Sequence, residues 1–342
     1  MSRRSLDAVR APRALHHVDF GGPPGAATVV CVHGLGGSHL NWDRLAPLLR
    51  TRHRVLAVDL PGFGLSPPPR GPATVRRNVD ELAGFLATCE APVTLVGNSM
   101  GGLIAVLVAS RHPDLVRALA LLDPALPAPG RLLRSPAALA RVLAYAVPGS
   151  GEWLRRVRRR RIGARATVEE TLRLGGIDPD TVPPDLLARS VALIEHQDDV
   201  VGFDRAYLSA SRSLAWAMAR AHSYQSAMAA LQIPVLLVHG DRDGLVPVGA
   251  ARAVARRCPA WRYVELKDVG HVPQLQVPDE VAGLLLPWLD ELDATPPPGR
   301  QAGVRSPILG RSPSSRSSHW RSAASQLDVV PPVRFELTLD GF

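Results

Sequence analysis

Short runs of apolar residues alternate with helical stretches through most of this chain, and this alternation constrains the fold more than any other feature. Six runs are almost continuously apolar, as expected for strands that are covered on both faces. They span residues 27–33, 55–60, 93–97, 118–122, 235–239 and 263–266. Helical patterns occupy residues 42–50, 75–89, 102–111, 249–257 and 280–292. The rhythm predicts an α/β fold with a mostly parallel sheet and helices on both faces, and a weaker edge strand within residues 14–20.

The rhythm breaks in the middle of the chain and again near its end. Residues 125–232 contain several amphipathic helices, punctuated by prolines, and no convincing strand. Ligands of open parallel sheets bind beyond the carboxyl ends of the strands. We therefore expect an all-helical cap inserted between two parts of one core domain, residues 14–124 and 233–294. Residues 295–342 are rich in proline and serine without periodicity, which predicts a disordered tail.

A candidate nucleophile lies between an apolar run and a helical stretch. Residues 97–101 read Gly-Asn-Ser-Met-Gly and fit the pattern G-x-S-x-G. Glycines permit a sharp strand-to-helix turn that exposes the serine hydroxyl, and the helix N-terminus favours the developing negative charge. This placement favours Ser99 as a nucleophile over an idle serine in a glycine-rich turn.

A second glycine-rich loop could bind the oxyanion of an acyl-transfer intermediate. Residues 33–37 read His-Gly-Leu-Gly-Gly and follow the first strong strand. A tetrahedral intermediate needs two backbone N–H donors aimed at its oxygen. We expect these donors to be the amides of Leu35 and Met100.

The general base should be a histidine on a loop at the strand ends. Of the eleven histidines, His271 lies in a Gly-His-Val-Pro loop between the last predicted strand and the last helix. His239 falls inside a strand pattern, and His33 heads the glycine-rich loop. Seven of the others lack a comparable loop context, and surface or structural roles are expected for them; they are His16, His17, His39, His53, His112, His196 and His222.

Three carboxylates compete to orient His271 and stabilise its cation. Asp241 and Asp243 both follow the strand at 235–239, and Asp243 lies further out on the loop, where it can reach a neighbouring one. Asp123 ends the strand beside that of the nucleophile. Asp123 and Asp59 can also be turn-forming carboxylates at strand ends. We favour Asp243 as the acid.

Together these segments resemble the α/β-hydrolase superfamily over about residues 14–292. The matching pieces are residues 33–37, Trp42, residues 59–64, residues 97–102, residues 240–247 and residues 270–273. They follow the family's order of serine, acid and histidine. The resemblance implies the fold and the triad, with Asp243 as the acid, and it treats the run after Asp59 as structural. Two departures are Gln276, where the family often has an acidic residue, and an abbreviated first hairpin.

The triad that the resemblance implies predicts hydrolysis of an ester through an acyl-enzyme, without a metal or organic cofactor. The resemblance does not imply a particular substrate, and we expect a small-molecule, apolar acyl substrate. A serine nucleophile is unlike the aspartate of dehalogenases and epoxide hydrolases in this family. The loop at residues 33–37 also lacks the HGGG form of many lipases. Cleavage of a C–C bond or perhydrolysis on the same triad remains an alternative, and so does a non-catalytic binding protein on the same fold.

The net charge of +9 comes almost entirely from arginine, since Lys267 is the only lysine. This usage indicates compositional bias, and no nucleic-acid partner is expected. The seven residues at 155–161 include six arginines. A solvated helix face is the simpler interpretation, and peripheral contact with an anionic membrane is the alternative. The N-terminus lacks the apolar stretch of a signal peptide, and three widely spaced cysteines favour a reducing environment, so a cytoplasmic location is expected.

Overall fold

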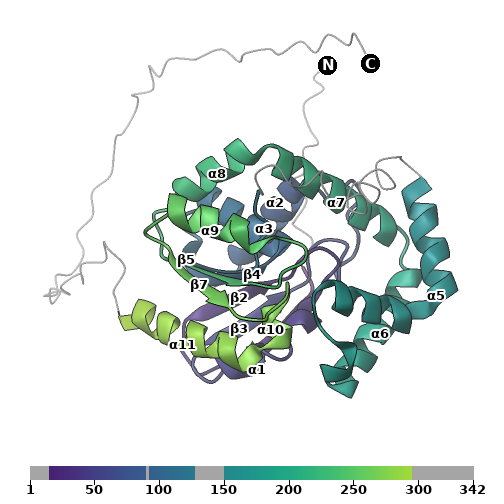
Figure 1. Ribbon diagram of the computed structural model, residues 1–342, viewed down its shortest axis with the longest axis horizontal. Coiled ribbons are helices and arrows are strands. Elements are labelled where there is room, and N and C mark those ends of the chain that lie inside the picture. The colour runs from purple at the N-terminus through teal and green to yellow at the C-terminus, as the bar shows by residue number, and fades with distance from the viewer. Residues whose placement is uncertain (1–14, 90–91, 128–149, 295–342) are drawn as a thin grey trace, which may run out of the picture. The chain divides into compact units, whose positions relative to one another are not determined.

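A computed structural model describes residues 15–89, 92–127 and 150–294 and shows a seven-stranded sheet with helices on both faces (Figure 1). The strands are β1 (His17–Gly21), β2 (Thr28–Val32), β3 (Arg54–Val58), β4 (Val93–Asn98), β5 (Val116–Leu122), β6 (Val235–Gly240) and β7 (Arg262–Leu266). Their order in the sheet is β1-β3-β2-β4-β5-β6-β7. Strand β1 pairs antiparallel with β3, and every other pairing is parallel. The predicted α/β fold is confirmed, and each of the six apolar runs forms a strand with bounds within two residues of the prediction, while the weaker edge strand begins three residues later than predicted.

The helices also follow the predicted rhythm. They are η1 (His39–Trp42), α1 (Ala46–Leu49), α2 (Val75–Leu86), α3 (Met100–Arg111), α5 (Ser150–Leu174), η2 (Pro179–Thr181), α6 (Pro184–Asp199), α7 (Phe203–Ala219), α8 (Ala221–Ala229), α9 (Val248–Arg257), α10 (Pro273–Gln276) and α11 (Pro278–Ala294). The single helix predicted at residues 42–50 is wrong, because the chain forms η1 and then α1. Pro47 lies in the first turn of α1, where a missing N–H is tolerated.

Alternate residues of each central strand pack against opposite helical layers. In β2, Val30 and Val32 join the core beneath α2, α3, α8 and α9, whereas Val29 and Cys31 join the core beneath α1 and α11. All residues of β2, β4 and β6 are buried. Burial of each large aliphatic side chain contributes about 1.5–3 kcal/mol, and this two-sided burial explains the nearly continuous apolar runs in the sequence.

The parallel arrangement brings the carboxyl ends of six strands to one edge of the sheet. The residues that leave this edge include His33 after β2, Asp59 after β3, Ser99 after β4 and Asp123 after β5. The loop that carries Asp243 follows β6 at the same edge. Chemistry-bearing residues that are distant in sequence are therefore neighbours in space.

A helical insertion, defined here as α5 to α8, separates β5 from β6, and its described residues contain no strand. Val168, Ile177 and Leu186 of the insertion share an apolar cluster with Leu40 of η1 and Leu275 of α10. Helix α8 is placed differently, because it packs on α3 and buries Tyr224 and Met228 in the main core. The part of the predicted cap at residues 128–149 and the predicted tail at residues 295–342 lie outside the described residues.

The arginine-rich run at residues 155–161 is not a uniformly solvated face, so that expectation is wrong for Arg159. Its side chain is only 7% exposed and donates to Asp204 of α7 and to Asp198 of α6, each at 2.5 Å. Arg155 also donates to Asp204, at 3.3 Å. Arg160 and Arg161 are exposed. No helix within the described ranges is long and apolar enough to span a bilayer.

The buried Arg159–Asp204 pair predicts that Asp204→Asn will weaken the insertion. The substitution leaves a buried guanidinium without its main counter-charge, which costs about 3–5 kcal/mol. Asp185→Asn, in an exposed pair with Arg189, should cost less than about 1 kcal/mol. Urea unfolding of both variants measures the difference, and equal losses of stability would contradict the structural role of Asp204.

Candidate active site

Ser99 lies on a strained turn between β4 and α3. Its backbone has φ 53° and ψ −120°, a region that residues other than glycine rarely adopt, at a cost of about 1–3 kcal/mol. The neighbouring glycines make room for the turn: a Cβ on Gly97 would lie 2.7 Å from the Cα of Gly102, and one on Gly101 would collide with the carbonyl oxygen of Val32. The side chain of Ser99 is partly exposed. The amide of Met100 begins α3 and has no intrahelical acceptor, so it is available to an anion.

The glycine-rich loop after β2 lies directly against this turn. A Cβ on Gly34 would lie 3.0 Å from the Cβ of Ser99. The buried ring of His33 holds the loop, because its Nδ1–H donates to the carbonyl oxygen of Gly34 at 2.7 Å and its Nε2 accepts from the amide of Leu60 at 3.0 Å. Burial lowers the pKa of His33, consistent with this neutral tautomer. Gly34 and Ser99 are therefore in contact. The predicted oxyanion residues, Leu35 and Met100, are the next residues after Gly34 and Ser99.

His271 bonds to the acid that the sequence favoured. Its Nδ1–H donates to Oδ2 of Asp243 at 2.7 Å, and both side chains are buried. Oδ1 of Asp243 accepts from the amides of Leu245 and Val246 at 2.7 and 2.9 Å. Burial acts to raise the pKa of Asp243, but the hydrogen bond and charge of His271 and the two amides bring it below its usual value. Asp241 instead accepts from the amide of Asp268 at 2.7 Å.

Asn98 joins the serine turn to the histidine loop, a role that the sequence analysis missed. Its Nδ2 donates to the carbonyl oxygens of Leu122 and His271, each at 3.0 Å. Across the described part of the chain, no direct hydrogen bond joins Ser99 to His271. Such bonds are often long without substrate and tighten in the complex. The signal available in the sequence was an amide side chain directly before the serine, at the end of an apolar run.

The helical insertion touches the histidine loop through two glycine pairs that the sequence analysis also missed. The amide of His271 donates to the carbonyl oxygen of Gly175 at 2.8 Å. A Cβ on Gly270 would lie 2.5 Å from that same oxygen and 2.9 Å from the Cα of Gly176. The main chains of the insertion and of the histidine loop are therefore in direct contact, and only glycine fits there.

Asp123, a competing candidate for the acid, contacts Asp243 rather than His271. It is fully buried at φ 44°, and its Oδ1 accepts from the amide of Gly240 at 2.9 Å. Burial, together with the charge of Asp243 beside it, raises the pKa of Asp123 well above its usual value of 3.8. His239 beside them has its pKa lowered by burial, and its Nε2–H donates to Val246. The three side chains carry ligand-type atoms, but all are buried, and Asp243 already serves His271.

A shallow cleft elsewhere on the structure contains none of the candidate catalytic residues. It lies between the loop at residues 64–68 and the insertion, next to His196, Gln197, Val200 and Phe203. Because no residue that lines this cleft belongs to the serine or histidine loop, we base the functional argument on those two loops.

The opposite pKa shifts of the two carboxylates predict opposite pH effects on stability. In the folded protein, Asp123 stays protonated at pH values above 3.8, at which the same residue ionises in the unfolded chain. Its contribution therefore makes the wild-type protein less stable as pH rises. Asp123→Asn, which mimics the neutral acid, should therefore gain stability relative to wild type as pH rises from about 4. Asp243→Asn should lose stability at neutral pH, and this loss should shrink below about pH 4.

Thermal unfolding of wild type and both variants from about pH 2 to pH 8 makes the measurement, because the change expected for Asp243→Asn lies below about pH 4. If Asp123→Asn and Asp243→Asn follow the same pH trend, the assignment of one neutral and one ionised carboxyl group is wrong.

The contact between the insertion and the histidine loop predicts a selective effect of Gly270→Ala. The added methyl group must push apart two main chains, which should displace His271 and lower kcat by about 100-fold, since misplacement by about 1 Å costs that much. Gly244→Ala is the matched control on the neighbouring loop, because a Cβ there meets nothing within 4 Å. Steady-state kinetics on a common ester should show no more than a small change for the control. Similar kcat values for the two variants would refute the coupling.

The sheet is mostly parallel and has helices on both faces. This fold, with the serine turn and the histidine–carboxylate pair at its edge, is typical of hydrolases. The chain belongs to the α/β hydrolase fold family, whose family model matches residues 27–278. The predicted resemblance is thereby confirmed.

Curated relatives of this chain include esterases and lipases. It is 34% identical over 252 residues to a pimeloyl-[acyl-carrier protein] methyl ester esterase of Chromobacterium violaceum, covering 72% of this chain and 88% of the relative. It is 41% identical over 119 residues to the lipase LipV of Mycobacterium tuberculosis, covering 34% of this chain and 45% of that protein. A solved thermophilic esterase of Thermogutta terrifontis shares 26% identity and a TM-score of 0.58, covering 81% of this chain and 93% of the other. These similarities support ester hydrolysis by this chain.

Proposed function

We propose that this protein is a serine esterase that hydrolyses a small carboxylic ester through an acyl-enzyme. The single observation that carries the proposal is the 2.7 Å hydrogen bond from His271 to Asp243 on a loop tied by Asn98 to the strained turn at Ser99. Ser99 is the nucleophile, His271 the general base and Asp243 the residue that orients and stabilises the imidazolium.

The proposed reaction begins when Nε2 of His271 takes the proton of Ser99 and the serine oxygen attacks the ester carbonyl carbon. The amides of Leu35 and Met100 bind the resulting oxyanion, a contribution of about 2.7–4 kcal/mol for each donor of this kind. The imidazolium then protonates the departing alcohol. Water activated by His271 attacks the acyl-enzyme, and the acid product leaves while the serine regains its proton.

Substrate choice in this proposal belongs to the helical insertion acting as a cap over the carboxyl edge of the sheet. Tyr207 of α7 reaches the glycine-rich loop, since a Cβ on Gly36 would lie 3.0 Å from its ring. Arg155 of α5 stacks on that ring, with its guanidinium carbon 3.6 Å from the ring centroid. The curated relative's name specifies a methyl ester of a pimeloyl group, so methyl esters of medium-length acyl chains are the first substrates to test.

Cleavage of a C–C bond and perhydrolysis stay as alternatives on the same triad, because both use the same serine, base and oxyanion donors. Membrane contact through the run at residues 155–161 also stays a prediction. The paired state of Arg155 and Arg159 reduces the basic surface that this contact would use.

Ser99→Ala should lower ester hydrolysis by about 10⁴-fold or more, because it removes the attacking oxygen. The assay compares p-nitrophenyl and methyl esters of increasing acyl length for wild type, Ser99→Ala and Asp243→Asn. Wild type, and not Ser99→Ala, should also react with a fluorophosphonate probe. Ser223→Ala, an exposed serine on α8, is the control and should keep full activity.

The outcomes separate the competing functions. A wild-type protein that neither reacts with the probe nor hydrolyses any ester would exclude the serine esterase and favour the non-catalytic binding protein. Probe labelling with cleavage of a β-diketone in place of esters would favour the C–C hydrolase.

A further inference from the structure

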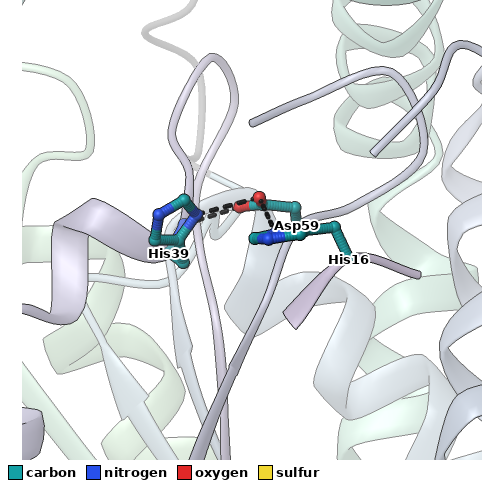
Figure 2. A group of neighbouring side chains, drawn as sticks. All are labelled: His16, His39 and Asp59. Atoms are coloured by element: carbon teal, nitrogen blue, oxygen red, sulfur yellow. Dashed lines mark hydrogen bonds and ion pairs between the residues drawn. The ribbon is translucent and has the colours of Figure 1, made fainter. Parts of the chain in front are cut away.

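A second cluster of titratable side chains lies apart from the catalytic loops, at the other end of the same sheet edge. It brings together His16, which precedes β1, His39 of η1 and Asp59, which follows β3 (Figure 2). Nδ1 of His16 lies 2.7 Å and Nδ1 of His39 lies 2.9 Å from the same carboxylate oxygen, Oδ2 of Asp59. For His16 and His39, the structural alternative among the expected roles is found, because both rings bond to Asp59; the sequence analysis did not connect these three residues.

The carboxylate at the centre of this cluster cannot swing away. Asp59 is fully buried, and its backbone amide donates to the carbonyl oxygen of His16 at 2.8 Å. Its Oδ1 accepts from the amide of His39 at 2.6 Å, and its Oδ2 also accepts from the amide of Leu65 at 2.9 Å. The hydrogen bonds thus fix both the carboxylate and the main chain of each histidine before any ligand arrives.

The donor atoms of the cluster suit a transition-metal ion. A carboxylate oxygen with two imidazole nitrogens directed at it supplies the donor atoms that bind a divalent transition-metal ion.

The cluster is also open to solvent, in contrast to the buried group around Asp123. The side chain of His16 is 32% exposed and that of His39 is 12% exposed. Their rings lie 5.1 Å apart between centroids and are tilted by 56°, so they approach the carboxylate from different directions. An ion can therefore enter from the histidine side, and water can complete its coordination.

The distances match a zinc site after a small adjustment. Tetrahedral Zn²⁺ holds nitrogen and oxygen ligands at about 2.0–2.2 Å, which places any two ligand atoms about 3.3 Å apart. The two nitrogen–oxygen distances of 2.7 and 2.9 Å must each grow by about half an ångström. Small rotations of two partly exposed rings can supply this change, while Asp59 stays in place.

We propose that His16, His39 and Asp59 bind a divalent transition-metal ion of the zinc type, through Nδ1 of each histidine and Oδ2 of the aspartate, with water in the remaining position. On binding, the metal replaces the two shared N–H protons, and each neutral imidazole carries its proton on Nε2. The ion cross-links the segment before β1, η1 and the loop after β3. Leu60 of that loop bonds the ring of His33, so the metal also steadies the glycine-rich loop.

The test is titration of the full-length, chelator-stripped protein with ZnCl₂ by calorimetry, and with CoCl₂ by visible absorption. Wild type should bind one zinc ion at this site with a Kd of about 10 µM or tighter. Cobalt should give the intense visible bands of four- or five-coordinate Co²⁺. Zinc should raise the thermal midpoint of unfolding of wild type, because it binds only the folded site.

Two variants remove a ligand while keeping the hydrogen bond to Asp59. His16→Asn and His39→Asn place an amide N–H where the imidazole Nδ1–H stood, so both should fold as the metal-free wild type does. Each should weaken zinc binding by more than the roughly 10–100-fold that loss of an outer-sphere partner costs. His17→Asn is the matched control, because this exposed neighbour on β1 directs its Nδ1 to the carbonyl oxygen of Leu15.

The catalytic loops are tested separately with His271→Ala, which should retain zinc binding at the cluster. Binding that survives in both His16→Asn and His39→Asn, or that disappears in His271→Ala, would place the ion elsewhere and overturn the proposal. Absence of the cobalt bands and of zinc stabilisation in wild type would show that the cluster is a hydrogen-bonded tie alone. Neither readout depends on esterase activity.

Discussion

The structure depends on the close approach of main chains where parallel strands β2 and β4 end. Gly34 lies against the Cβ of Ser99, and Gly101 lies against the carbonyl group of Val32, so no side chain fits between these loops. This contact forces Ser99 into a strained backbone conformation that the packed sheet and α3 then hold. The buried core on both faces of the sheet supplies the free energy that maintains this strain, and the turn leaves the side chain of Ser99 partly exposed.

Burial also decides which groups at this edge of the sheet are charged. Asp243 stays ionised because His271 and two amides donate to it, whereas Asp123 beside it is raised in pKa by burial and by the charge of Asp243. His33 and His239 have lowered pKa values and use defined ring nitrogens as donors or acceptors. The edge thus holds one carboxylate for the histidine of the proposed triad without placing two negative charges side by side.

The helical insertion is connected to this edge by polar contacts as well as by apolar packing. Arg159 and Asp204 tie α5 to α7 inside the insertion, and Gly175 receives the amide of His271. Any movement of the turn at Gly175 therefore acts on the main chain of the proposed general base. Through this hydrogen bond the insertion can change the position of His271. The insertion also contacts the glycine-rich loop through Tyr207.

The sequence by itself determined the features that are written in local periodicity and in short motifs. The apolar runs predicted the strands to within two residues, and the Gly-Asn-Ser-Met-Gly turn predicted the strand-to-helix reversal at Ser99. Loop context also selected His271, because the motif lies between a recognisable strand and helix. These signals are local, since burial on two faces and glycine turns act over a few residues.

Only the tertiary structure decided which distant side chains meet. It paired His271 with Asp243 and placed Asp123 next to the carboxylate of Asp243. From the sequence, three aspartates could be ranked as partners of His271, but their contacts could not be determined. It also joined His16 and His39 through Asp59, since these residues meet only once β1 and β3 pair antiparallel and η1 folds over the end of β3. Spacing along a chain does not encode the order of strands in a sheet, and that order sets which loops become neighbours.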